Sequence, residues 1–174
     1  MVGFWLYHLL MSSLLLTDIA FAECLLGALR LILCFTVLGL LLAISLIDAD
    51  TMLIPNKLNA ALLACGVLAV FLVPEVTIAS RLIGLCCISV PLLLFSLMIP
   101  GSFGGGDIKL MAAAGLLLGW QSVLLAAVIG LGTGGVYGAC LVVSGKKRSQ
   151  DHFALGPSLC LGIAVALLCG SFPT

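Results

Sequence analysis

Apolar runs of membrane-spanning or near-spanning length constrain the fold of this chain more than any other feature. A helix needs about 20 apolar residues to cross the hydrocarbon core of a bilayer. Of the 174 residues, 63% are hydrophobic and 8% are charged, whereas about a quarter of a soluble domain is charged. The sequence therefore predicts an all-α, polytopic membrane bundle of about six to seven transmembrane helices, of which the third and fifth are short. The runs cover residues 4–22, 25–47, 58–73, 82–99, 108–120, 122–143 and 154–169.

The first run has the length of a signal peptide, but its flanks favour a helix that is retained. Residues 1–7 contain no Lys or Arg, and Asp18 and Glu23 stand where a signal peptide has a small-residue cleavage site. We expect residues 1–24 to form an extra N-terminal transmembrane helix and residues 25–174 to form the membrane core. No internal repeat divides the chain further.

The basic residues predict an orientation in the membrane. If the runs cross in alternation, Lys57, Lys109 and the basic cluster 146–148 fall on one side, and Arg30 and Arg81 lie near the other. The positive-inside rule makes the first side cytoplasmic. The connections after the second, fourth and sixth runs are then expected to share the cytoplasmic face. Basic and acidic residues balance at seven each, so the sequence shows no footprint for nucleic acid as a partner.

One carboxylate lies between two apolar runs, directly after three glycines at residues 104–106. The glycines leave the backbone free to bend, and they let another peptide approach without a side chain in the way. Asp107 opens the next helix, where the positive end of the macrodipole and unpaired N–H groups favour its ionised form. Taken alone, the stretch is equally well explained as a loop glycine cluster followed by an acidic N-cap.

A second acidic site follows the second apolar run, at Asp48 and Asp50. Pro55 and Asn56 then end one helix and start the next. In the expected topology Asp48 closes a helix at the boundary where Asp107 opens another, so the two carboxylates can meet. Residues two apart on a helix point to nearly opposite sides, so only one of Asp48 and Asp50 can face a shared pocket. Composition does not say which one.

Two aspartates in a partly dry pocket share a proton, because both cannot ionise comfortably. The ionised carboxylate takes a proton from water while the protonated one polarises a peptide carbonyl. Because the helix N-terminus favours ionised Asp107, we take Asp107 as the base and Asp48 as the acid. Serine and zinc hydrolysis are disfavoured, since the chain has no G-x-S-x-G or H-E-x-x-H motif. The eight cysteines form no C-x-x-C pair and are interpreted as small buried hydrophobic residues.

The two acidic motifs together resemble those of the type IV prepilin peptidases, which are intramembrane aspartic proteases of the G-x-G-D type. The first motif reads Ile-Asp-Ala-Asp-Thr-Met-Leu-Ile-Pro-Asn from residue 47, and the second reads Gly-Gly-Gly-Asp-Ile-Lys-Leu from residue 104. Residues 153–159 resemble the Phe-Gly-Pro segment that opens the last helix of that family. The resemblance implies that Asp48 and Asp107 are the catalytic pair. The supporting positions that it implies are Gly104, Gly106, Lys109, Asp50, Pro55 and Asn56.

The resemblance also implies a substrate and a place of action. The substrate is a type IV prepilin or pseudopilin precursor, whose short basic leader is cut just before its hydrophobic helix. Cleavage takes place at the cytoplasmic face of the bacterial inner membrane. The lipid bilayer and pilus or secretion assembly proteins are the further partners expected, and neither a cofactor nor a metal is implied. Long members also N-methylate their product and carry a domain with two C-x-x-C pairs, so methyltransferase activity is not expected here.

Two alternatives from other functional classes stay open at this point. A small ion- or proton-coupled transporter also uses intramembrane carboxylates and glycine-interrupted helices. A catalytically inactive assembly factor of the same fold would not need either aspartate.

Overall fold

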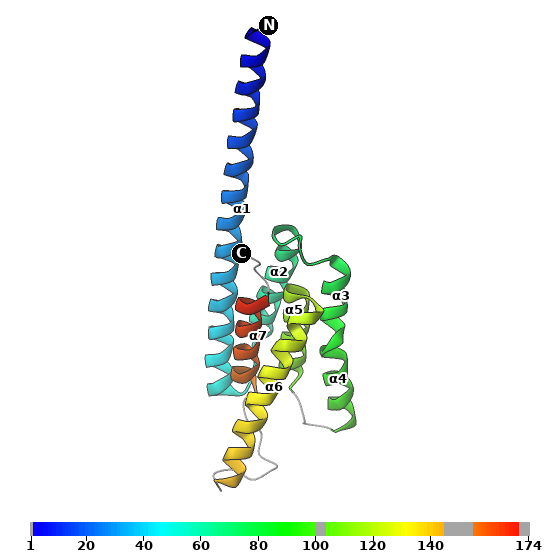
Figure 1. Ribbon diagram of the computed structural model, residues 1–174. Helices are drawn as coiled ribbons and strands as arrows, with labels where there is room; N and C mark the ends of the chain where they lie inside the picture. The colour runs from blue at the N-terminus through cyan, green and yellow to red at the C-terminus, as the bar shows by residue number, and fades with distance from the viewer. Residues whose placement is uncertain (1, 100–103, 145–154, 171–174) are drawn as a thin grey trace.

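The computed structural model describes residues 2–99, 104–144 and 155–170, and this part of the chain is an all-α bundle without strands. The fold class predicted from the sequence is confirmed. The bundle stands beside the lower half of α1, whose upper half projects beyond the other helices (Figure 1). The helices are α1 (Val2–Thr51), α2 (Asn56–Leu72), α3 (Ile78–Cys87), α4 (Ser89–Met98), α5 (Gly105–Leu118), α6 (Trp120–Val143) and α7 (Gly156–Gly170).

The first two apolar runs form the single helix α1, so the helix boundary expected near residue 24 is wrong. No proline occurs in residues 2–51, and the segment around Glu23 consists largely of good helix formers, so nothing ends the helix there. The 50 residues of α1 correspond to a length of about 75 Å. Because the hydrocarbon core is about 30 Å thick, a straight α1 cannot place both runs in one bilayer. The domain division at residue 24 stays a prediction.

The run at 82–99 was expected to be one helix, but it is divided into α3 and α4 at Ile88. Pro91 explains the break, because its ring removes a backbone donor and clashes with the carbonyl four residues earlier. The helix also begins four residues earlier than expected, where the Thr77 hydroxyl accepts a hydrogen bond from the Ser80 N–H at 3.3 Å. The combined segment Ile78–Met98 is still long and apolar enough to cross a membrane.

The short helix α5 occupies the centre of the bundle, where it packs against α2, α3, α4, α6 and α7. Its 14 residues confirm the expected short helix after the glycine loop. It crosses α3 at very close range, since a Cβ on Gly84 would stand 2.6 Å from the Gly115 carbonyl oxygen. Small residues at such crossings let the backbones of membrane helices touch. At its far end Gly119 adopts a positive φ of 82°, which ends the helix.

The outer surface of the bundle is strongly apolar, as expected for a membrane protein. Large side chains such as Phe35, Phe71 and Val128 are each more than two-thirds exposed. The segments Phe21–Thr51, Ile78–Met98 and Trp120–Cys140 are long and apolar enough to span a bilayer. The expectation that the cysteines are buried is largely wrong, because only Cys160 is buried and several others lie on this outer surface.

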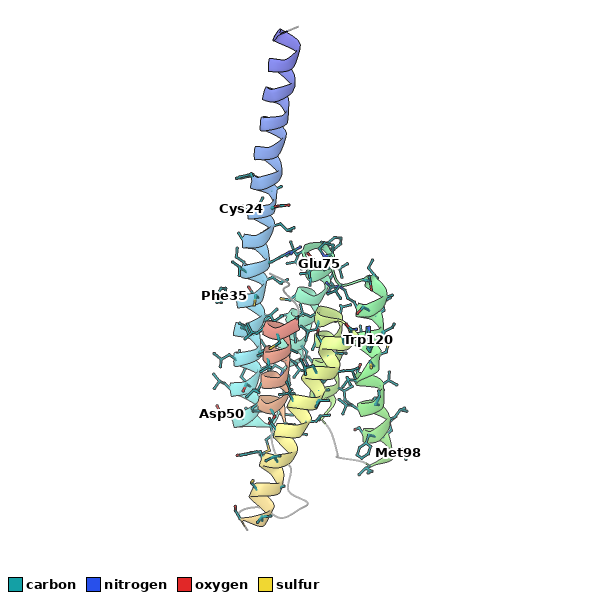
Figure 2. All side chains as sticks on the ribbon, in the orientation of Figure 1. Cys24, Phe35, Asp50, Glu75, Met98 and Trp120 are labelled. Atoms are coloured by element: carbon teal, nitrogen blue, oxygen red, sulfur yellow. The ribbon has the colours of Figure 1, made fainter. Side chains whose placement is uncertain are left out.

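The helix ends that were expected to share one face of the membrane lie at the same end of the bundle. The C-terminal ends of α1, α4 and α6 and the N-terminal ends of α5 and α7 all lie toward the lower end of the bundle in Figure 1. Asp50 and Met98 mark this end in Figure 2, and Glu75 marks the opposite one. The cluster 146–148 lies outside the described residues.

At the opposite end, one buried cation holds two helices together. Arg81 on α3 is 1% exposed, and its guanidinium donates to five backbone carbonyls at 2.7–3.3 Å. Four of these carbonyls belong to the last turns of α2 and α5, where the negative ends of the helix dipoles and unpaired acceptors favour a cation. Arg81 therefore fixes α5 relative to α2. The five acceptors are Ala69, Val73, Val76, Leu116 and Leu117.

A surface ion pair lies near the same end. Arg30 donates to Glu75 at 2.8 Å and to the Leu72 carbonyl at 2.7 Å. The pKa of Glu75 is lowered because its own backbone N–H donates to the carboxylate and because Arg30 is beside it. This pair links the loop after α2 to α1.

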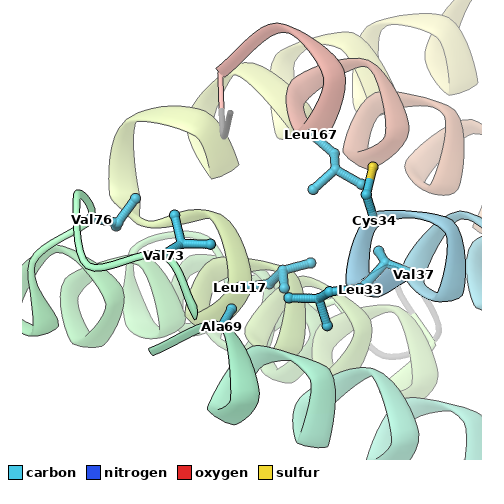
Figure 3. A pocket seen from close by; sticks show the side chains of 8 residues that line it. All are labelled: Leu33, Cys34, Val37, Ala69, Val73, Val76, Leu117 and Leu167. Carbon is cyan, nitrogen blue, oxygen red and sulfur yellow. The ribbon is translucent and has the colours of Figure 1, made fainter. Parts of the chain in front are cut away.

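A small cavity in the bundle interior is lined almost wholly by hydrocarbon. Side chains of α1, α2, α5 and α7, together with Val76, converge on it (Figure 3). Among the side chains of the lining residues, only that of Cys34 carries a heteroatom. Without convergent polar groups this cavity has no means of binding a polar ligand.

Candidate active site

Asp48 lies close to the end of α1 and points into the bundle. The helix ends because Met52 adopts a left-handed conformation, with φ of 53°, and its N–H bonds to the Asp48 carbonyl at 2.9 Å. The Asp48 side chain is 4% exposed. Asp50 is exposed, on the outside of α1 (Figure 2). The structure therefore separates the two acids that composition left equivalent.

The carboxylate of Asp48 contacts the first turn of α7. The N–H of Gly156 donates to Asp48 Oδ2 at 2.9 Å. A Cβ at Gly156 would stand 2.7 Å from Asp48 Cγ, so only glycine leaves room for the carboxylate at this place. The contact places Asp48 at the positive end of the α7 dipole, where a negative charge is favoured.

Asp107 lies in the first turn of α5, where the glycine cluster turns the chain into the helix. Gly104 precedes the helix, and its carbonyl accepts the Asp107 N–H at 3.1 Å. The Asp107 side chain is 8% exposed, and its Oδ1 is buried without a hydrogen-bond partner among the described residues. A buried charged oxygen that lacks a donor is costly, so these surroundings favour a neutral, protonated Asp107.

The glycine cluster also brings the two acidic motifs together. A Cβ at Gly106 would stand 2.9 Å from Ile54 Cβ, so the segment after α1 lies directly against the N-terminus of α5. A Cβ at Gly104 would stand 3.1 Å from Asp107 Oδ2. Both positions therefore need the small size of glycine.

The two carboxyl groups are both buried, at the same end of the bundle. They come from α1 and α5, and within the described ranges neither takes part in a salt bridge. Two coupled carboxyls in a site from which water is largely excluded hold one proton between them. The arrangement can therefore supply one acid and one base. The contacts favour Asp48 as the ionised member, which is opposite to the assignment made from the sequence.

The other residues singled out in the sequence lie at the N-terminus of α2. Pro55 precedes this helix, and its carbonyl accepts N–H groups from its first turn. The Asn56 Oδ1 accepts a hydrogen bond from Lys109 Nζ at 3.0 Å, so both side chains bridge α2 and α5. Neither one contacts a carboxylate of the pair in the described structure.

Sequence reasoning gave no role to three residues that the structure makes prominent. Gly156 was noted only within the segment 153–159, of which residues 153–154 lie outside the described part of the chain. Asn59, a polar residue in the apolar run of α2, donates from Nδ2 to the Gly106 carbonyl at 3.1 Å. Arg81 was used only for orientation, although an intramembrane arginine is itself a sign of a special role. Among the described residues no cluster of three His, Cys, Asp or Glu side chains suits a metal ion.

Comparison with known proteins identifies the family of this chain. The profile of the type IV leader peptidase family matches residues 33–139, a segment that contains both Asp48 and Asp107. The chain belongs to the type IV leader peptidase family. No solved structure matches this chain significantly.

Curated relatives in this family are named prepilin leader peptidase/N-methyltransferase. The chain is 32% identical to the protein of Aeromonas salmonicida strain A449 over 137 residues, which cover 75% of the chain and 46% of the relative. It is 33% identical to that of Legionella pneumophila over 144 residues, covering 78% and 50%. It is 29% identical to that of Bacillus subtilis strain 168 over 133 residues, covering 76% and 54%. The chain thus spans about half the length of the curated relatives it matches.

Proposed function

We propose that this membrane protein is an aspartic endopeptidase that removes the short basic leader of type IV prepilins or pseudopilins. The observation that carries the proposal is the position of two buried carboxyl groups, Asp48 near the end of α1 and Asp107 at the start of α5, at the same end of the helical bundle. Membership of the type IV leader peptidase family supports the substrate class, as do the names of the relatives. Pilus or secretion assembly proteins are further partners under this proposal. Methyltransferase activity is not part of it.

The proposed reaction needs one ionised and one protonated aspartate. Asp48, which the Gly156 N–H and the α7 dipole favour as an anion, takes a proton from the attacking water. Asp107, favoured as a neutral acid, donates a hydrogen bond to the scissile carbonyl oxygen. Water adds to the carbonyl carbon as Asp107 gives its proton to the carbonyl oxygen, and a tetrahedral diol forms. Asp48 then gives its proton to the amide nitrogen while Asp107 takes one back from a diol hydroxyl, the C–N bond breaks, and the pair returns to its starting charge.

The proposal places the pair at the cytoplasmic face of the bacterial inner membrane. Lys57 and Lys109 lie beside the ends of α2 and α5 that carry the site, and Arg30 and Arg81 lie toward the other end. The positive-inside rule favours this orientation. We also assign residues 25–174 to the peptidase core and residues 1–24 to an additional N-terminal segment. The start of the family match at residue 33 supports that division.

Co-expression with a candidate prepilin tests the function, with loss of the leader followed by mass spectrometry. Asp48→Asn and Asp107→Asn should abolish cleavage while the protein still inserts into the membrane. Asp50→Asn is the matched control, because Asp50 is exposed on the same helix, and it should retain cleavage. Cleavage by all three variants would rule out the aspartic mechanism. If the wild type cleaves no precursor, the assigned function is incorrect.

A further inference from the structure

A groove between α2 and α5 lies beside the proposed active site. Its volume is about 300 Å³, within the range of ligand-binding pockets, which begins at about 300 Å³. The α2 residues that line it follow the helical spacing i, i+3, i+4, i+7, and those of α5 follow i, i+3, i+4, so each helix contributes one face. The lining residues are Asn56, Asn59, Ala60, Leu63, Lys109, Ala112 and Ala113.

The groove changes from polar to apolar along its length. Asn56 and Lys109 bridge its end near the glycine loop, with 3.0 Å between Oδ1 and Nζ. Leu63 and Ala113 line it farther along the helices, toward the middle of the bundle. The seven steps along the helix from Asn56 to Leu63 correspond to about 10 Å, which matches about three residues of extended chain.

Asn59, which lines this groove, carries an unused hydrogen-bond acceptor. The side chain is 5% exposed, and its Oδ1 is buried without a hydrogen-bond partner among the described residues. The amide cannot simply rotate to relieve this, because Nδ2 is held by the Gly106 carbonyl at 3.1 Å. A buried acceptor held in this way is suited to an N–H group supplied by a ligand.

The groove and the carboxyl pair are connected through the glycine loop. Asn59 bonds to the carbonyl of the residue that precedes Asp107. A Cβ at Gly105, next to this carbonyl, would meet nothing within 4 Å. Among the described residues, the space over Gly105 between the groove and the Asp107 side of the helix end is therefore open to an extended peptide.

We propose that the groove binds the segment of the precursor that directly follows the scissile bond, with Asn59 Oδ1 accepting one of its backbone N–H groups. This inference rests on the proposed function. The mature segment is apolar and matches Ala60, Leu63 and Ala113. The leader is basic, and the charge of Lys109 disfavours it at the groove entrance. The leader thus lies on the other side of the carboxyl pair. Asn59 is a substrate-binding residue that selects an extended backbone at this place.

Filling the groove gives the first test. Ala112→Leu adds bulk to the partly exposed floor of the groove, and Ala79→Leu makes the same change at an exposed position on α3. The added side chain should push the bound segment out of the groove, so that its hydrogen bond to Asn59 is lost. With purified enzyme and a synthetic precursor, Ala112→Leu should therefore raise KM by roughly tenfold, the scale of one buried hydrogen bond, with little change in kcat. Ala79→Leu should match the wild type. If the two variants behave alike while the wild type cleaves, the groove inference is refuted and the proposed function stands.

Substrates with single amide-to-ester replacements identify the bond to Asn59 directly. Replacing one N–H shortly after the scissile bond should cost the wild type roughly tenfold in kcat/KM. The same replacement should cost Asn59→Ala nothing further, because the acceptor is already gone. A purely structural role for Asn59 predicts equal losses in both enzymes, and that result would overturn the assignment.

Crosslinking reports on occupancy without any cleavage. A photoreactive residue at position 112 of the inactive Asp107→Asn variant, in membranes that contain the precursor, should label the mature segment. The same residue at the exposed position 82 on α3 should label lipid. Labelling of lipid alone at position 112 would contradict the proposed occupant. If the wild type cleaves no precursor and position 112 labels none, both proposals fail.

Discussion

Substituting Gly156 by alanine tests whether α7 holds Asp48 in its reactive position. The new Cβ would stand 2.7 Å from Asp48 Cγ and 2.9 Å from Asp48 Cβ. Carbon atoms in contact prefer a separation of about 3.5–4.0 Å, so the carboxylate and α7 must move apart by about 0.8–1.3 Å. The hydrogen bond from the Gly156 N–H, 2.9 Å long in the native protein, would be stretched beyond a useful length. Asp48 would then lose both its position and its donor.

The size of the effect follows from these two losses. A hydrogen bond to a charged group contributes about 1.5–3 kcal/mol, and a displacement of about 1 Å in an active site can cost about a hundredfold in rate. We therefore expect Gly156→Ala to lower kcat by about a hundredfold or more. The effect on KM should be smaller, because the groove between α2 and α5 is not altered.

The assay follows the rate of leader removal by purified enzyme in proteoliposomes. Gly39→Ala is the matched control, because Gly39 lies on α1 and a Cβ there would meet nothing within 4 Å. Thermal unfolding in detergent shows whether each variant is folded. A folded Gly156→Ala enzyme that cleaves at the wild-type rate would refute the positioning role of α7. Loss of activity in Gly39→Ala as well would show that the assay reports on helix stability instead.

Three further predictions concern the carboxyl pair, the buried cation and the N-terminal segment. The cleavage rate should rise and then fall with pH between acidic and neutral values, because one carboxyl must be ionised while the other is protonated; a rate that depends on one ionisation only would contradict this. Arg81→Met should lower the free energy of unfolding by about 3 kcal/mol or more, since hydrogen bonds from a charged donor contribute about 1.5–3 kcal/mol each. Arg30→Met, at the surface ion pair with Glu75, should lower the free energy of unfolding by only about 0–1 kcal/mol. Equal shifts in the thermal unfolding of Arg81→Met and Arg30→Met would contradict the role of Arg81 at the ends of α2 and α5. Deleting residues 2–20 should leave prepilin cleavage by the inserted protein unchanged, and its loss would show that the upper part of α1 belongs to the core.

The sequence was most informative where a single residue type has one physical consequence. Long apolar runs gave the helical bundle, and the glycines before Asp107 predicted the short helix that begins there. Sequence reasoning failed at helix boundaries, because hydropathy does not show whether a helix-breaking residue is present. Nothing near Glu23 breaks a helix, so two runs continue as α1. Conversely, Pro91 divides a run that hydropathy alone treats as continuous. Hydropathy measures how apolar a segment is and not whether its backbone is interrupted.

The protonation of the carboxyl pair could not be predicted from the local sequence, because the deciding donor comes from another helix. Asp107 begins its own helix, yet its N–H bonds to the Gly104 carbonyl and its Oδ1 has no donor among the described residues. Asp48 ends a helix, a position that disfavours an anion, but it meets the first turn of α7, 108 residues away along the chain. The position of α7 is set in turn by its packing on α6, where a Cβ on Gly162 would stand 2.7 Å from the Gly130 nitrogen. Small residues on α6 and α7 thereby determine how far α7 reaches toward Asp48, and so whether the Gly156 N–H can bond to its carboxylate.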